Sequence, residues 1–399
     1  MVVAYFPPEI GSAAHIFLDL AKAFAKRGHD VDVMTSYPRK FNLSKADAEK
    51  EFPLEEVIEN VHIHRCKHPV QRDIVILRGL EHFLLPIYYS NTYFKLHKKF
   101  DVCLMYIPPL PLYYLARIIK SLDGTPTVLN IQDFHPQELT DTGVLKNRIM
   151  IKLMEYIEQR TYKKADFITV LSNGGIDYIV KRGGDPAKIR HIYNGCLISD
   201  KDNDAIKKDF KRKENIEDKF LVTYAGILSS MQGIDNILDE AKELRSHDDI
   251  VFYIVGDGMI KQHLRDRINK ENIFNVNLLP LQPRNEYLNI VNSSDMSIVS
   301  LDERMKAPCI PGKLINLFML NQPILAVVPE DSETAWVVSA SKSGILASQG
   351  GLKDAILNLK NNKQLLRAMG ENGRKFLENN MNLEKNVIIY EEIFNNILK

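Results

Sequence analysis

Residues 1–35 read MVVAYFPPEIGSAAHIFLDLAKAFAKRGHDVDVMT, and this stretch decides the fold. The apolar runs Val2–Phe6 and Val31–Thr35 predict two β-strands, because β-branched and aromatic residues are typical of strands. Between them, apolar residues recur at helical spacing over Ala14–Arg27, which predicts an amphipathic helix. A strand, a helix and a second strand form a right-handed crossover, so the two strands are expected to be parallel.

The same alternation of strands and helices continues along the chain. A densely charged stretch at 199–219 interrupts it and has the composition of a linker. The sequence therefore predicts two α/β domains, residues 1–198 and 199–382, each with a doubly wound parallel sheet. A final helix at about 383–399 fits either domain. The further predicted strands are Val61–Arg65, Val102–Ile107, Thr127–Ile131, Phe167–Leu171, Ile189–Ile192, Phe220–Ala225, Ile250–Val255, Val276–Leu279, Met296–Ser300 and Pro323–Val328.

Composition excludes several classes of protein. The 399 residues carry 52 Lys+Arg against 51 Asp+Glu, a net charge of +1, which argues against a surface built to grip nucleic acid. A hydrophobic content of 45% is that of a globular chain and not of a disordered one. No apolar run is long enough to cross a membrane, and no signal peptide is recognised. We expect a cytoplasmic enzyme.

The pattern of cysteine, histidine and aspartate indicates no metal site. The four cysteines are isolated in the sequence, which favours buried free thiols over zinc ligands. Asp30-Val31-Asp32 matches a D-x-D motif but stands at the entry to a predicted strand, so its role is expected to be structural. We expect no metal and no cofactor.

In the first domain, two turns that follow strands could carry chemistry, because ligands of doubly wound sheets bind at the carboxyl ends of strands. After the first strand, Gly11 and Ser12 would let a ligand approach the backbone, although a simple tight turn is the alternative. Asp133 follows Thr127–Ile131, where its carboxylate could accept a proton or hold an acceptor hydroxyl. The alternative is that Asp133 caps the following helix.

In the second domain, glycines again follow the strands. Gly226 and Gly256 allow close approach to the backbone, and the loop carrying Ser229 could bind a phosphate through its N–H groups. Lys313 is predicted to begin a helix, where the helix dipole opposes a positive charge. A bound diphosphate would resolve that conflict, whereas the alternative is an exposed lysine on a surface turn.

These turns together resemble glycosyltransferase family 4. The resemblance rests on motifs in the family's order over nearly the whole chain: Tyr5–Ala13, Lys26–Val31, Ala165-Asp166, Ser172, Tyr193-Asn194-Gly195, Gly226, Val255–Gly258 and Met369–Arg374. Asp133–Pro136 and Pro311–Lys313 are similar to motifs of the subgroup that acts on amino sugars in O-antigen and capsule assembly, such as fucosamine transferases.

The resemblance implies a GT-B fold, with two facing Rossmann-like domains, and a retaining transfer without an essential metal. The donor would be a nucleotide sugar, with a UDP-linked N-acetylamino sugar expected. The acceptor would be lipid-linked or a glycan. The residues it implies are Gly226, Ser229, Lys313 and Arg304 at the diphosphate, Gly11 and Ser12 opposite, Gly256 in the donor domain, Gln282 at the base and Asp133 near the anomeric centre or acceptor hydroxyl.

Four positions depart from the family pattern, one of them being Gln132, which stands where the family usually has a histidine. Asn316 and Pro308 stand where members usually carry two glutamates, and Gln232 replaces the lysine before the glycine of the phosphate loop. An asparagine can still bond a ribose hydroxyl, but a proline supplies no polar group. Two alternative functions therefore stay open: a nucleotide-sugar 2-epimerase, and a protein that binds nucleotide sugars or glycans with weakened catalysis.

The segment 65–100 carries seven Lys and Arg residues and only two acidic ones, with aromatic residues between them. Such a pattern predicts a helix that lies on an anionic membrane, so we expect peripheral docking at the inner face of the cell membrane. The alternative is that the apolar residues are core and the charges are solvated. The residues assigned to docking and to the acceptor are Arg72, Arg78, Phe83, Tyr88, Lys95 and Lys98.

Overall fold

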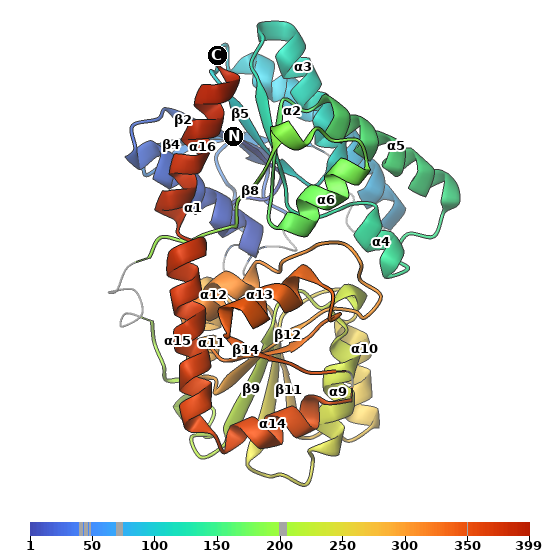
Figure 1. The fold of residues 1–399 in the computed structure, drawn as a ribbon, viewed down its shortest axis with the longest axis vertical. Coiled ribbons are helices and arrows are strands. Elements are labelled where there is room, and N and C mark those ends of the chain that lie inside the picture. The colour runs from blue at the N-terminus through green and yellow to red at the C-terminus, as the bar shows by residue number, and fades with distance from the viewer. Residues whose placement is uncertain (40–42, 44–46, 48, 69–74, 199–205, 349) are drawn as a thin grey trace. The chain divides into compact units, whose positions relative to one another are not determined.

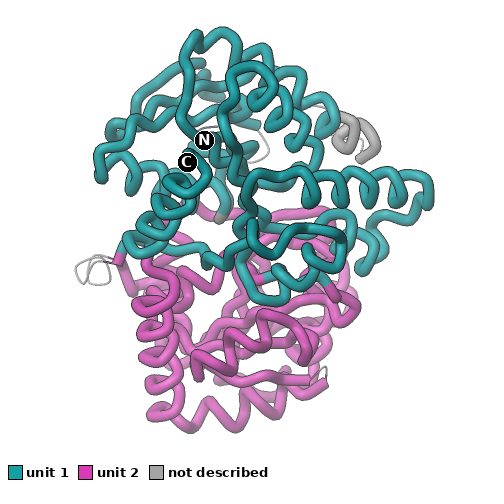
Figure 2. The backbone as a smooth tube through the Cα atoms, turned by 45° about the horizontal axis from the view of Figure 1, so that its top comes forward, with its two compact units in different colours: residues 1–197, 307–309, 383–399 teal, residues 198–306, 310–382 magenta. Residues whose placement is uncertain are grey.

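The computed structural model describes residues 1–399 other than 40–42, 44–46, 48, 69–74, 199–205 and 349 (Figure 1). The chain forms two compact units, coloured separately in Figure 2. Unit 1 comprises Met1–Leu197, Ala307–Cys309 and Leu383–Lys399, and unit 2 comprises Ile198–Lys306 and Ile310–Asn382. The predicted domain boundary, after residue 198, lies beside the division at Leu197.

Unit 1 is built on a sheet of eight strands in the order β3-β4-β2-β1-β5-β6-β7-β8. The pairing is parallel except between β3 and β4, which are antiparallel, so the expectation of a wholly parallel sheet was wrong at this edge. The strands are β1 (Val2–Val3), β2 (Val31–Ser36), β3 (Glu55–Ile58), β4 (Val61–Cys66), β5 (Cys103–Ile107), β6 (Thr127–Ile131), β7 (Phe167–Val170) and β8 (Ile189–His191).

The first strand is shorter than predicted because its end is bonded elsewhere. β1 ends at Val3, and the carbonyl of Ala4 accepts a hydrogen bond from Nη2 of Arg39 at 3.2 Å instead of a strand partner. The helices of unit 1 are α1 (Ser12–Lys26), α2 (Val75–Lys95), the 3-10 turn η2 (Leu110–Leu112), α3 (Tyr113–Asp123), α4 (Gln137–Asp141), α5 (Arg148–Lys164), α6 (Asn173–Lys181), η3 (Pro186–Lys188) and α16 (Leu383–Ile397).

The final helix, α16, completes the core of unit 1. The ring centroid of Phe24 on α1 lies 5.9 Å from that of Tyr390 and 5.6 Å from that of Phe394 on α16. The Tyr390 hydroxyl accepts a hydrogen bond of 2.8 Å from Asn130 on β6. Figure 1 shows α1 and α16 side by side, although 356 residues of chain separate their ranges.

Unit 2 has a six-stranded, wholly parallel sheet in the order β11-β10-β9-β12-β13-β14. Its strands are β9 (Phe220–Ala225), β10 (Ile250–Val255), β11 (Val276–Leu279), β12 (Met296–Ser300), β13 (Ile324–Val327) and β14 (Gly344–Leu346). Its helices are α8 (Phe210–Lys213), the 3-10 turn η4 (Ser230–Gln232), α9 (Ile234–Glu243), α10 (Lys261–Lys270), α11 (Arg284–Ser293), α12 (Lys313–Met319), α13 (Glu333–Ser341), α14 (Leu352–Lys360) and α15 (Lys363–Asn380).

The strand orders locate the place where each sheet can bind a ligand. In unit 2 the chain winds from β9 to β10 on one side and returns to β12 on the other, so the order reverses between β9 and β12. In unit 1 it reverses between β1 and β5. Doubly wound sheets bind ligands outside the carboxyl ends of the strands at such a reversal. The loops after β9 and β12 are therefore the first place to look for a site.

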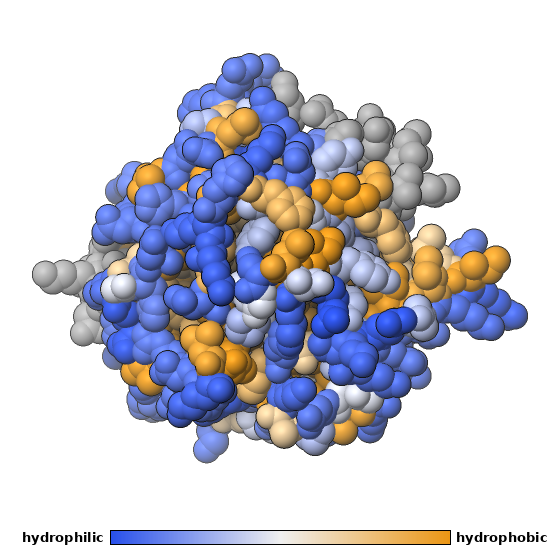
Figure 3. Space-filling model, turned by 90° about the horizontal axis from the view of Figure 1, so that it is seen from above, coloured by the Kyte–Doolittle hydropathy of each residue, from blue (hydrophilic) through white to orange (hydrophobic). Residues whose placement is uncertain are grey.

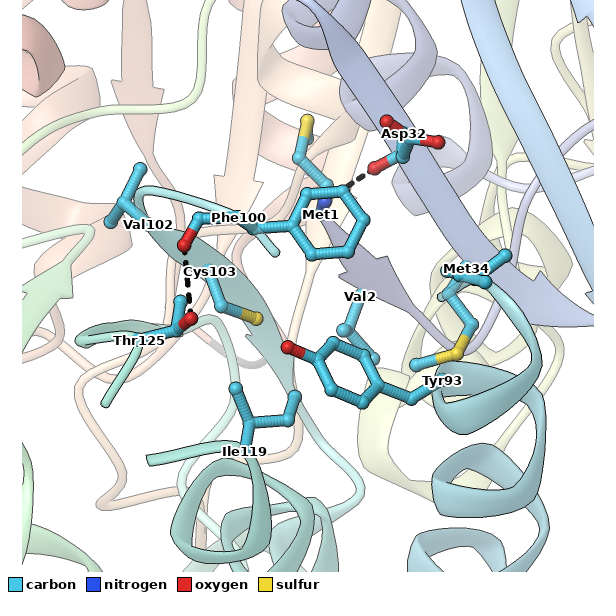
Figure 4. A pocket seen from close by; sticks show the side chains of 11 residues that line it. Met1, Val2, Asp32, Met34, Tyr93, Phe100, Val102, Cys103, Ile119 and Thr125 are labelled. Atoms are coloured by element: carbon cyan, nitrogen blue, oxygen red, sulfur yellow. Dashed lines mark hydrogen bonds between the residues drawn. The ribbon is translucent and has the colours of Figure 1, made fainter. Parts of the chain in front are cut away.

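A cavity of about 30 Å³ lies in unit 1 at the amino ends of the strands, away from the carboxyl ends where a ligand is expected (Figure 4). Met1, Asp32 and Cys103 stand at these strand starts, and the ring of Tyr93 closes one side. Its lining is mostly apolar, and its volume suits one or two waters. None of the predicted site residues lines it.

No helix in the described part of the chain is long and apolar enough to span a bilayer.

Candidate functional site

In unit 2, the turns after β9 and β10 pack against each other through glycine. The Gly226 N–H donates to the Val255 carbonyl at 2.9 Å, and a Cβ atom on Gly256 would lie 1.9 Å from the Gly226 carbonyl oxygen. A Cβ on Gly258 would lie 2.2 Å from the Leu228 oxygen. Real Cβ atoms do not approach an oxygen this closely, so glycine is required at both positions.

Lys313 reaches into this pair of turns from the start of α12. Its Nζ lies 4.0 Å from the ring centroid of Tyr224, a cation–π distance, and 3.4 Å from Oε1 of Gln232. A Cβ atom on Gly226 would come within 2.8 Å of the same nitrogen. The lysine is half-buried, so the alternative of an exposed lysine on a surface turn was wrong.

The charge of Lys313 is not balanced by a carboxylate among the residues that the structure describes. Burial lowers the pKa of its ammonium group to about 7. Gln232 and Tyr224 offer an amide oxygen and a ring face, which are weaker partners than an anion. The Lys313 ammonium group is therefore held beside the backbone turns after β9 and β10. A positive group in this position can bind an anion.

The other residues predicted for the donor make contacts of their own within unit 2. Arg304 forms two bonds of 2.8 Å with the Asp302 carboxylate, which balances its charge. Gln282 donates to the Pro280 carbonyl at 3.0 Å. Asn316 hydrogen-bonds the buried Tyr287 hydroxyl, and the Ser229 side chain makes no capping bond to η4.

In unit 1, the Asp133 carboxyl group lies near enough to that of Glu138 to affect its pKa. The N-cap of α4 is Pro136, with no side-chain capping bond, so the capping role considered for Asp133 is not what the structure shows. Glu138 instead accepts the Phe134 N–H at 2.7 Å. Burial raises the pKa of Asp133 to about 6, and burial together with Asp133 raises that of Glu138 well above its ordinary value.

The segment Ala307–Cys309 packs with unit 1, although the sequence assigned it to the second domain. The Ala307 N–H donates to Oδ2 of Asp141 at 3.1 Å. The pKa of the buried Cys309 thiol is raised by desolvation and also by the neighbouring Glu138 and Asp133 carboxyls. Pro308, the position where a glutamate is missing, therefore belongs to a segment that lies beside two carboxyl groups of unit 1.

The turn after β1 leaves its glycine open. Gly11 is exposed at the N-cap of α1, and a Cβ atom there would meet nothing within 4 Å. Of Ser12 the structure describes only the backbone. Beside this turn, Glu9 and Arg39 form a buried ion pair, with Nε 2.7 Å from Oε1 and exposed fractions of 2% and 6%.

Of the residues assigned to membrane docking, the structure describes the exposure of Phe83, Tyr88, Lys95 and Lys98. Arg72 lies outside the described residues, and Arg78 is described only in its backbone. Phe83 and Tyr88 are half-buried on α2, and Lys95 is exposed.

Part of the positive charge of segment 65–100 is balanced by acidic residues from outside the segment. Lys98 contacts Asp30 at 2.8 Å and Asp32 at 2.6 Å, and the buried Arg65 pairs with Glu56. Asp32 also contacts His64, so the structural role expected for the D-x-D motif is confirmed.

Sequence reasoning missed Tyr224 and Glu138. Tyr224 is fully buried near the end of β9 and reads as a core aromatic, yet its hydroxyl donates to Gln232 at 3.2 Å and its ring lies under Lys313. Glu138 stands five residues after Asp133, in the first turn of α4. An acidic residue there is ordinary for a helix start, so its pairing with Asp133 carried no separate signal.

Comparison with known families matches both units. Residues 11–195 match the family described as glycosyl transferase 4-like domain, and residues 205–376 match glycosyl transferases group 1. The chain is a glycosyltransferase. Its Gly226, Gly256 and Lys313 all fall inside the group 1 domain, and its Asp133–Glu138 pair falls inside the 4-like domain. These two domain matches confirm the predicted resemblance to glycosyltransferase family 4.

Two relatives are named as glycosyltransferases, one of them in colanic acid biosynthesis. The glycosyltransferase is 23% identical over 328 residues to the putative colanic acid biosynthesis glycosyl transferase WcaI of Escherichia coli (strain K12), covering 78% of each chain. It is 25% identical to the probable glycosyltransferase WbjE of Pseudomonas aeruginosa, covering 68% of each.

Solved structures confirm the predicted GT-B fold of this glycosyltransferase. Sucrose-phosphate synthase from Thermosynechococcus elongatus superposes with a TM-score of 0.77 at 14% identity, covering 99% of this chain and 98% of the other. WaaG, a glycosyltransferase involved in lipopolysaccharide biosynthesis, gives 0.69 at 16% identity over 97% of each chain. Anabaena HepE, solved with UDP-glucose, gives 0.69 at 13% identity over 98% of each.

Proposed function

We propose that this enzyme transfers a sugar, with retention and without a metal, from a UDP-linked N-acetylamino sugar to a lipid-linked or glycan acceptor. One observation carries the proposal: the Lys313 ammonium lies against Tyr224 and Gln232, beside the turn at Gly226, and no carboxylate in the described part of the chain balances its charge. A UDP diphosphate would supply the missing negative charge.

The chemistry follows from where charge develops. When the bond between the anomeric carbon of the sugar and the phosphate oxygen of UDP breaks, the leaving UDP gains negative charge. An ammonium group fixed beside it stabilises the transition state more than the ground state. The turn at Gly226–Ser229 begins with a glycine and ends with a serine. The Gly226 and Leu228 N–H groups donate to carbonyls of the next turn, and those of Ile227 and Ser229 can approach the same phosphates. Charge on the leaving group is then stabilised by this chain's own residues.

UDP is the nucleotide in two of the solved neighbours, whereas starch synthase IV from Arabidopsis thaliana was solved with ADP. HepE has been solved with UDP and glucose, and TarM with UDP and Fondaparinux. These two complexes support UDP as the nucleotide of the donor. The amino sugar rests on the sequence motifs at Asp133–Pro136 and Pro311–Lys313.

Asp133 is the residue we propose at the reacting sugar. With a pKa of about 6 its carboxylate is mostly ionised at neutral pH, yet still able to exchange a proton with an acceptor hydroxyl. Glu138 beside it stays protonated to a higher pH, because two neighbouring buried carboxylates do not readily ionise together.

The carboxyl pair also favours the alternative of a nucleotide-sugar 2-epimerase, which needs acid and base groups. The two functions separate in one experiment. Purified enzyme is incubated with a panel of UDP-sugars, with and without an acceptor glycan extract, and the products are separated by chromatography. Transfer requires the acceptor, whereas epimerisation converts the donor without one. UDP-sugar binding by calorimetry with neither product would leave the third function, binding alone.

For the acceptor, we propose peripheral association with the inner face of the cell membrane. Exposed Leu84, Ile87 and Phe94 on α2, together with exposed Lys95, support a surface that meets lipid.

A further inference from the structure

A second helix of unit 1, α5, presents apolar side chains outward. Ile149 is 82% exposed, Leu153 43% and Tyr156 53%. Large apolar side chains with that exposure, repeated along one helix, form a surface that soluble proteins rarely leave without a partner. Sequence analysis assigned no role to this helix.

The exposure belongs to a formed helix and not to a frayed end. The Asn147 side chain caps α5, accepting hydrogen bonds from the N–H groups of Ile149 at 3.0 Å and Met150 at 3.1 Å. The opposite face is anchored, because Ile157 and Tyr162 are buried in unit 1. The outward face is therefore held in a fixed orientation.

The charges on α5 follow the apolar residues. Residues 146–164 contain six Lys and Arg residues and two Glu. Glu158 points inward and pairs with Arg182 at 3.2 Å. At about 100° of rotation per residue, Ile149, Leu153 and Tyr156 share one sector of the helix with Arg160, flanked by Lys152 and Lys163, while Glu155 lies outside it. Figure 3 shows the start of α5 projecting at the right, with apolar and hydrophilic side chains adjacent.

The neighbouring helix α3 extends this surface. Arg160 donates to the Tyr156 hydroxyl at 2.6 Å, and its charge also interacts with Tyr113 and Tyr114 of α3. Tyr114 is 41% exposed, and Arg117 next to it is exposed as well. Aromatic residues with a polar end, beside basic residues, are typical of a membrane–water interface.

A second copy of the chain fits this surface poorly. A two-fold dimer through α5 would place its basic residues opposite the same residues of the partner, because a two-fold interface uses one patch twice. No acidic side chain in the outward sector would balance them. An anionic lipid surface supplies both the negative charge and the apolar layer that the helix lacks.

We propose that the outward face of α5, with Ile149, Leu153 and Tyr156 at its centre, docks the enzyme on an anionic membrane. The inference rests on the membrane-linked acceptor of the proposed function, and it moves the principal contact from α2 to α5.

The test measures sedimentation with vesicles of phosphatidylcholine alone and of phosphatidylcholine rich in phosphatidylglycerol. The apolar variant is Ile149→Ser/Leu153→Ser/Tyr156→Ser, and the charge variant is Lys152→Glu/Lys163→Glu. The matched control changes three apolar residues of comparable exposure elsewhere, Phe274→Ser/Leu365→Ser/Ile388→Ser. UDP binding by calorimetry checks in every variant that unit 2 is intact, and near-UV circular dichroism checks unit 1.

We expect the unchanged protein and the control to sediment with anionic vesicles and not with neutral ones. Both α5 variants should bind about tenfold more weakly or worse, with unchanged UDP affinity. Equal sedimentation with both lipids, or α5 variants that sediment like the control, would overturn the proposal. A change in molar mass by light scattering instead of vesicle binding would identify a second copy as the occupant. Vesicle binding without any sugar transfer would refute the proposed function and leave the docking surface standing.

Discussion

At the scale of single residues, Lys313 is where protonation and ligand binding are linked. With a pKa of about 7 in the free protein, the Lys313 ammonium group loses its proton and its charge as pH rises past neutrality. Bound UDP favours the charged form, so binding takes up a proton above pH 7. UDP affinity is therefore expected to fall as pH rises from 7 towards 9. Calorimetry at several pH values measures it, with Lys313→Met as the control that keeps only UDP's own titration.

The same lysine is expected to cost stability in the free enzyme. Its pKa is lower in the folded state than the ordinary value of 10.5, so between these values the unfolded chain holds more protons and stability rises with pH. Replacing it with methionine should raise the apoprotein's melting temperature at pH 7 while reducing the stabilisation by UDP. A variant that melts lower and keeps full UDP stabilisation would contradict the site assigned to Lys313.

The Asp133 carboxyl group is expected to determine how the rate of transfer changes at acidic pH. Burial raises its pKa from 3.8 to about 6, so below pH 6 it carries a proton and cannot act as a carboxylate. kcat/KM for transfer is expected to rise with pH through about 6, and to fall again above neutrality because Lys313 loses its proton there. Asp133→Asn should lower turnover and remove the acid limb. If Asp133→Asn keeps the wild-type profile, the acid limb belongs to another group.

At the scale of elements, two glycine turns differ in a way that separates stability from binding. A Cβ at Gly256 would lie 1.9 Å from the Gly226 oxygen, whereas a Cβ at Gly11 meets nothing within 4 Å. Gly256→Ala should lower the melting temperature and UDP affinity together, because the backbone must move. Gly11→Ala should leave the melting temperature unchanged and reduce activity only if substrate approaches that turn. Thermal denaturation and steady-state kinetics of the two variants provide the comparison.

The turn after β1 is held by the buried pair of Glu9 and Arg39. Arg39 also stacks on the Tyr5 ring at 3.9 Å, so it joins the strand end to the loop before α1. Arg39→Met would leave the Glu9 carboxylate buried without its partner, which costs about 3–5 kcal/mol of unfolding free energy. Urea denaturation measures the loss. Glu9→Gln/Arg39→Met is the control, because it removes the stranded charge and should recover part of the stability.

Sequence patterns predicted the elements of this fold better than their contacts. Strands such as β6 and β10 were placed at their observed bounds, because buried parallel strands are short apolar runs between turns. The edge strand β3 was missed, since Glu55 and Glu56 hide its character.

Charge partners were harder to predict from the sequence than strands. Lys98 and Asp32 are 66 residues apart, and only the fold brings them together. For the same reason the sequence placed Lys313 correctly at a helix start but gave no information on the Tyr224 ring beneath it.

At the scale of the whole molecule, unit 1 is closed by a helix that follows unit 2 in the chain. Val387, Tyr390 and Ile393 of α16 are buried in its core. A chain that ends at Asn382 would expose the apolar residues of α1 that these side chains cover. Calorimetry of such a truncation should show a lower transition for unit 1, while UDP still raises the transition of unit 2. A single unchanged transition would contradict this assignment.

The position of α16 also has a consequence for biosynthesis. Most of unit 1 leaves the ribosome before unit 2, yet the helix that covers Phe24 leaves after it. During translation, the apolar face of α1 therefore stays uncovered until the whole of unit 2 and then α16 have been synthesised. Nascent chains of this enzyme should thus depend on chaperones until α16 has left the ribosome, and slow translation of unit 2 would prolong the period in which they can aggregate.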